Sequence, residues 1–187
     1  REAGETERFN SLMTSFETFL NDLYQRKEGQ SFGSLSWIGE TYFALGEASE
    51  KDPSRSSAFF EKGGNAFQEI LDQAATQPDY LPAGQAAAVK VRLIRCYRLK
   101  KEFETGEQLL GEVLQEKDTN LRAQVEGALL YQDWGTSGDT DKLLTAINGN
   151  EKLLVWGWAN LGFRLQNMVD QGRNEFLPTL WSRLASA

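Results

Sequence analysis

The sequence contains no histidine and only one cysteine among its 187 residues. Histidine is the usual general base of nucleophilic catalysis and a common zinc ligand, so its absence argues against both kinds of site. Cys96 cannot form an internal disulfide, and it lies in the apolar helical segment VRLIRCYRL. This setting predicts a small buried side chain rather than a reactive thiol. A single thiol suits a reducing or an oxidising compartment, so the localisation stays unknown.

Long apolar runs and an excess of basic residues are also missing. No stretch approaches the roughly 20 apolar residues that a membrane-spanning helix needs, so no span is predicted in this segment. The formal net charge of −7 argues against general nucleic-acid binding, which favours basic surfaces. A hydrophobic content of 40% and a charged content of 25% are typical of a folded globular chain. Its length suits one well-cored domain or a short stack of repeats.

Two short motifs resemble functional sites but lack the partners that their chemistry needs. Residues 29–33, GQSFG, match the G-x-S-x-G pattern of a nucleophile elbow, which requires a histidine base and a preceding strand. A helical pattern precedes this segment, so we interpret it as a loop between helices. In SGDTDK, Asp139 and Asp141 supply too few oxygen ligands for a calcium loop and are interpreted as helix caps. We expect neither a metal site nor a cofactor.

Apolar residues recur at three- and four-residue spacing through most of the chain, which predicts an all-α protein. In the first such segment, residues 7–26, one face carries Phe9, Leu12, Phe16, Phe19, Leu20 and Leu23. Further helices are expected over residues 34–48, 51–75, 85–100, 102–116, 121–134, 142–147, 151–169 and 174–184. The segment TQPDYLPAG, with its two prolines, is the longest expected connector.

Several residue pairs repeat with one period in the second half of the chain. Tyr97 and Tyr131 are 34 residues apart, and Leu165 follows at the same interval. Leu110 and Leu144 keep the same offset, as do Val113 and Ile147. Because several pairs share one register, they predict a repeating unit of two helices.

The segment WANLGFRL, residues 158–165, resembles the tetratricopeptide repeat, whose first helix carries W-x-x-L-G-x-x-Y. The earlier segment IGETY resembles the same signature. The resemblance covers about residues 33–170 and implies a right-handed α-α superhelix of about four antiparallel hairpins. It makes the chain one domain, 1–187, with residues 1–30 and 173–187 as terminal caps. One departure is about twelve extra residues, EASEKDPSRSSA, between the helices of the first unit.

The resemblance also explains why glycine occurs within predicted helices, where it costs roughly 1 kcal/mol relative to alanine. The two helices of such a hairpin cross closely, and the crossing needs small residues. We expect small residues at these crossings, namely Gly39, Ala128 and Gly162 on first helices and Gly63 and Gly106 on second helices.

A stack of this kind implies a concave face lined by the first helix of each hairpin. The residues that the repeat register places on or beside this face as partner contacts are Arg92, Arg95, Arg98, Arg122, Gln132, Trp156, Phe163 and Gln166. Guanidinium groups near aromatic side chains suit an extended peptide with carboxylates and apolar side chains. The alternative is a solvated basic stripe paired with local glutamates.

The sequence therefore predicts a non-enzymatic protein-interaction module whose partner is a protein or peptide segment, expected to be acidic. A second interpretation is a structural assembly or self-association domain of a larger protein. A more remote one is a small-ligand binder or an enzyme with a pocket inside the curve.

Overall fold

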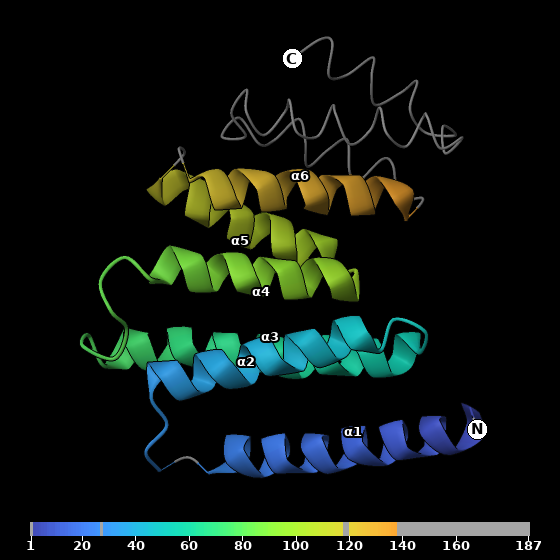
Figure 1. Ribbon diagram of the computed structural model, residues 1–187. Helices are drawn as coiled ribbons and strands as arrows, with labels where there is room; N and C mark the ends of the chain where they lie inside the picture. The colour runs from blue at the N-terminus through green and yellow to red at the C-terminus, as the bar shows by residue number, and fades with distance from the viewer. Residues whose placement is uncertain (1, 27, 118–119, 138–187) are drawn as a thin grey trace.

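The computed structural model describes residues 2–26, 28–117 and 120–137, which form six α-helices and no strand (Figure 1). The helices are α1 (Glu2–Gln25), α2 (Phe32–Ala48), α3 (Pro53–Thr76), α4 (Ala86–Lys100), α5 (Phe103–Glu116) and α6 (Leu121–Thr136). The all-α prediction is confirmed for this part of the chain. The helices expected over residues 142–147, 151–169 and 174–184, and hence the C-terminal cap, lie outside the described residues.

Polar caps define where several helices begin. The Ser31 hydroxyl accepts a hydrogen bond from the Ser34 amide (3.2 Å), and the Ser34 hydroxyl accepts one from the Ser31 amide (2.8 Å). This reciprocal pair is a capping box at the start of α2. The serine of the G-x-S-x-G segment is thus a helix cap, and the next two residues of that segment already belong to α2. Asp52 and Asn120 cap α3 and α6 through a single bond each, because their side chains accept hydrogen bonds from the amides of Arg55 and Ala123.

The helices lie in layers that follow the chain order (Figure 1). The pair α2 and α3 packs between α1 and α4, α4 pairs with α5, and α6 packs against both α4 and α5. Buried apolar residues form three clusters, each joining consecutive layers. The first cluster, around Leu20 and Tyr42, lies between α1 and the α2–α3 pair. The second, around Phe67 and Leu93, lies between the α2–α3 pair and α4. The third, around Tyr131, lies between α4, α5 and α6. Each layer thus buries its apolar surface against its neighbours, as in a repeat stack.

Glycines lie where the paired helices cross, as the sequence predicts. A Cβ atom on Gly39 would lie 2.7 Å from the Phe67 ring, and one on Gly63 would lie 3.0 Å from the Gly39 carbonyl oxygen. A Cβ on Gly106 would lie 3.5 Å from the Tyr97 Cβ of the paired helix α4 and 3.1 Å from Leu130 of α6. Close approach of the backbones lets the neighbouring aromatic side chains pack, and this burial offsets the low helix propensity of glycine. Gly162 lies outside the described residues.

The first hairpin differs from the expectation of twelve extra residues between its helices. Only residues 49–52 connect α2 to α3, and most of the additional residues extend the helices themselves. The reason is local: Ser49 ends α2, and Asp52 with Pro53 starts α3, because proline at the first helical position needs no amide partner. The first hairpin is therefore longer than the second.

The apolar face predicted for the first segment is only partly used by α1. Met13 and Leu20 are buried against the next layer, whereas Leu12, Phe16 and Phe19 are 69%, 37% and 50% exposed. The apolar face of α1 is wider than the surface that α1 buries against α2 and α3. An apolar stripe of Leu12, Phe16 and Phe19 therefore faces outward.

Cys96 is buried in the cluster between the first and second hairpins, which confirms the interpretation of its setting. Within the described residues, none of the helices combines the length and apolar character needed to cross a membrane.

Candidate functional site

Three helices contribute side chains to one shared groove: α2 and α4, which are the first helices of the two described hairpins, and α6. Spacing of three and four residues places Val91, Arg92 and Arg95 on one face of α4. Glu40 of α2 faces them from one neighbour, and the first turns of α6 face them from the other. The groove has a volume of about 470 Å³ and is lined by Glu40, Ala88, Val91, Arg92, Arg95, Leu121, Arg122, Val125 and Glu126. We call it the α2–α4–α6 groove.

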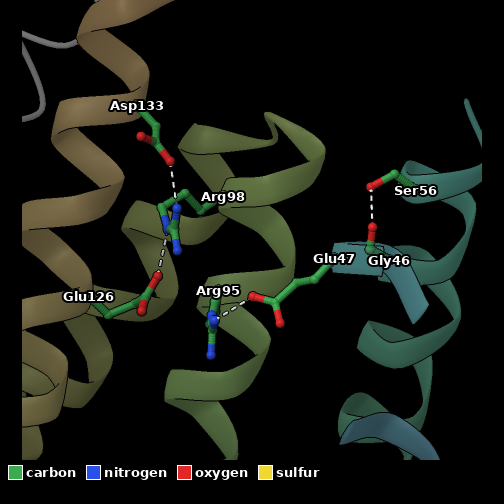
Figure 2. Close-up of polar contacts among 7 residues, drawn as sticks. All are labelled: Gly46, Glu47, Ser56, Arg95, Arg98, Glu126 and Asp133. Atoms are coloured by element: carbon green, nitrogen blue, oxygen red, sulfur yellow. Dashed lines mark hydrogen bonds and ion pairs between the residues drawn. The ribbon is translucent and has the colours of Figure 1, made fainter. Parts of the chain in front are cut away.

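Arg92 and Arg95 each pair with a glutamate of the preceding hairpin. Arg92 binds Glu40 through its Nε atom, and its guanidinium also lies 3.4 Å from the Ala88 carbonyl oxygen. Arg95 donates a hydrogen bond to Glu47 at 2.8 Å (Figure 2). The side chains of these two pairs are 38–53% exposed, so water reaches every charged group.

The guanidinium of Arg95 also lies on an aromatic ring. Its central carbon is 4.1 Å from the centre of the Phe43 ring, within the range of a cation–π interaction. Phe43 itself is buried, so the ring is a fixed platform. The conformation of Arg95 is therefore set by two contacts, of which only one is ionic.

Arg98 belongs to the same face of α4 in sequence but is buried between helices. Its Nε atom donates to Glu126 at 2.6 Å, and a terminal nitrogen donates to Asp133 at 2.5 Å (Figure 2). The side chains of Arg98 and Glu126 are each 9% exposed. Burial alone would lower the pKa of Arg98, but the carboxylates of Glu126 and Asp133 raise it above the ordinary value. Arg98 is thus a fully charged cross-link between α4 and α6.

Arg122 is the third cation of the groove. It is exposed in the first turn of α6, and among the described residues it forms no ion pair. Gln132 lies outside the groove lining and is half-buried, with a buried amide oxygen that has no hydrogen-bond partner in the part of the chain described here. The remaining predicted contacts, Trp156, Phe163 and Gln166, lie outside the described residues.

The structure therefore brings Arg92, Arg95 and Arg122 together and separates Arg98 from them. The ion pairs of Arg92 and Arg95 agree with the alternative of a solvated basic stripe paired with glutamates, but the sequence analysis did not identify the partners Glu40, Glu47 and Glu126. The sequence does contain a pattern that points to these residues: Glu40 and Glu47 are seven residues apart on one helix face, as are Glu126 and Asp133. Such spacing marks one stripe of a helix, but not which neighbouring helix it faces.

A second hollow of about 640 Å³ lies where α2 meets α3 and where α4 meets α5. Some of its polar groups are used within the protein. Ser56 donates to the Gly46 carbonyl oxygen at 2.7 Å (Figure 2), and Lys100 pairs with Glu102 at 2.9 Å. It therefore offers fewer free polar groups to a ligand than its size suggests.

The comparisons with known proteins add no relationship to these observations. The chain matches no protein-family model, and no match was found among curated proteins or solved structures. Within the described residues, no cluster of three or more acidic or cysteine side chains has a geometry that could hold a metal ion.

Proposed function

We propose that this chain is a tetratricopeptide-like, non-enzymatic interaction module that binds an acidic, extended segment of a partner protein in the α2–α4–α6 groove. The observation that carries the proposal is the convergence of Arg92, Arg95 and Arg122 in one groove of a protein whose net charge is −7. Glu40 and Glu126 line the same groove, so its lining has a small excess of positive charge within an acidic chain, and such an excess favours acidic partners.

The composition of the groove suits a peptide with mixed side chains. Val91 and Val125 supply apolar surface between the arginines, and Leu121 is 57% exposed at the rim. Guanidinium groups bind carboxylates through planar pairs of donors, and the valines favour an aliphatic side chain between those carboxylates. The partner segment is therefore acidic with interspersed aliphatic residues.

Fluorescence anisotropy with a labelled peptide of repeated Glu-Glu-Leu units tests this function. We expect saturable binding that weakens as salt is added, and no binding of the matching Lys-Lys-Leu peptide. Arg122→Glu should weaken binding by about tenfold or more, because it reverses the one groove cation that is free of an ion pair in the described residues. Lys51→Glu, at an exposed position outside the groove, is the matched control. Equal effects of the two substitutions would contradict the assignment.

A second candidate function, self-association, is favoured by the outward-facing stripe on α1. Phe16 and Phe19 stack with ring centres 6.4 Å apart, next to the exposed Leu12. Clustered apolar side chains on a surface are typical of interaction sites. Light scattering should then report an oligomer that becomes a monomer in Leu12→Ser with Phe19→Ser, while Arg122→Glu leaves it unchanged. A monomeric parent protein would contradict this candidate.

A further inference from the structure

Two of the three arginines in the groove, Arg92 and Arg95, are already paired with carboxylates of the protein itself. Glu40 and Glu47 lie on α2, while Arg92 and Arg95 lie on α4, so each pair joins two successive hairpins. Glu40 lines the groove and Glu47 lines the neighbouring hollow, and each binds its arginine where a carboxylate of an acidic ligand would have to bind. A ligand that binds Arg92 and Arg95 has to replace them.

From this arrangement, and resting on the proposed function, we propose that Glu40 and Glu47 are internal competitors of the acidic partner segment, which binds by exchanging with them. The glutamates therefore set the affinity of the groove and select partners that present several carboxylates. A single carboxylate gains little, since it replaces one ion pair with another of the same kind.

Exposure decides which pairs can exchange. The side chains in the Arg92–Glu40 and Arg95–Glu47 pairs are 38–53% exposed, so released glutamates are readily hydrated. Releasing Glu126 from Arg98 would instead leave a carboxylate that is 9% exposed without its partner. Exchange is therefore confined to the two pairs that involve α2.

The groove offers a fixed starting point for this exchange. Arg122 is exposed and has no ion pair within the described residues, so a first carboxylate can bind it without displacing a group of this part of the chain. Val91 and Val125 then receive an aliphatic side chain. Arg95 keeps its place on the Phe43 ring when Glu47 leaves, so the cation stays ordered for the incoming carboxylate.

Neutralising the competitors tests the proposal. The probe is the fluorescein-labelled Glu-Glu-Leu repeat peptide, and the variant combines Glu40→Gln with Glu47→Gln. We expect this variant to bind the probe about tenfold more tightly than the parent protein, because both arginines lose an internal anion. The control combines Glu28→Gln with Glu61→Gln, two exposed glutamates outside the groove, and changes the net charge by the same amount.

The possible outcomes separate this inference from the function on which it rests. If both double variants bound the probe more tightly by the same factor, the gain in affinity would come from overall charge alone, and the inference would be overturned. Unchanged affinity in the groove variant, with saturable binding by the parent protein, would overturn the inference and leave the proposed function standing. If neither the parent protein nor any variant binds the probe while thermal melts stay cooperative, the proposed function itself fails. Glu47→Gln alone serves if the double variant does not fold.

Discussion

Arginines of α4 bridge both to the first hairpin and to α6, yet these bridges differ in their environment. At the junction of α2 and α4, Arg92 and Arg95 pair with glutamates in water-accessible positions. At the junction of α4 and α6, Arg98 is enclosed with Glu126 and held by two carboxylates. Solvent screens the first kind of bridge, whereas the second leaves a buried charge uncompensated when one partner is lost. One arginine-rich helix face thus contains both accessible cations and a structural cross-link.

The largest expected effect is at the buried bridge. Arg98→Met should lower the free energy of unfolding by about 3 kcal/mol, because Glu126 stays buried without its cation. Chemical denaturation measures this change. Arg98→Met with Glu126→Gln removes the isolated charge as well, and we expect it to recover part of the loss. A loss below about 1 kcal/mol in the single variant would show that the buried bridge resembles an exposed one.

The crossing inside the first hairpin should come next. Gly39→Ala places a Cβ atom 2.7 Å from the Phe67 ring, so the packing has to shift, and we expect a loss of about 1–3 kcal/mol. Gly111→Ala is the matched control, because no atom outside its own helical neighbourhood lies within 4 Å of that Cβ position. It should gain up to about 1 kcal/mol from helix propensity. Similar melting temperatures for the two variants would contradict the close crossing.

The exposed bridges should contribute less. Arg92→Met and Arg95→Met are each expected to cost less than about 1 kcal/mol, with Arg95 the more costly because it also loses the contact with Phe43. Chemical denaturation in low and high salt checks this. Added salt screens exposed ion pairs, so it should reduce the difference in the free energy of unfolding between each variant and the parent protein. If either variant matched the loss of Arg98→Met, the contrast between the junctions would disappear.

The smallest effect concerns a carboxylate that opposes folding at the second junction. Burial raises the pKa of Glu107, although its contact with the Tyr131 hydroxyl at 3.5 Å acts in the opposite direction. A raised folded-state pKa means that stability falls as the pH rises from the unfolded pKa through the folded one. Glu107→Gln should therefore be more stable than the parent at pH 7, and the gain should vanish below about pH 4. Because Glu107 is only partly buried, we expect a gain below about 1 kcal/mol, measured by thermal melts across this pH range.

The helices and their crossings could largely be predicted because they depend on local patterns. Apolar spacing defined the six described helices, and the small residues Gly39, Gly63 and Gly106 are at the crossings that the repeat register assigned to them. Apolar spacing also came close to the first connection, with helices over 34–48 and 51–75, whereas the repeat register placed about twelve extra residues between them. The register could not place these residues, because they are polar in both a loop and an exposed helical turn, and only the caps at Ser49 and Asp52 separate the two.

The candidate site could be predicted only in part, because ionic partners come from neighbouring hairpins. The register placed Arg92, Arg95 and Arg122 in one groove, and they line it together. It also placed Arg98 beside them, since a repeat register gives the direction of a side chain but not how closely the next helix packs. The burial of Arg98 depends on α6, whose Glu126 and Asp133 lie 28 and 35 positions further along the chain.

The enclosed thiol of Cys96 offers a practical route to following this molecule in solution. Burial raises its pKa to about 12, so very little thiolate exists near neutral pH. Because the thiolate is the nucleophile, electrophilic thiol reagents should leave Cys96 unmodified in the folded protein. A cysteine introduced at an exposed position, such as Lys51→Cys, would then react selectively. Dyes attached in pairs on different helices would report the distance between those helices by energy transfer, with the native cysteine left in place.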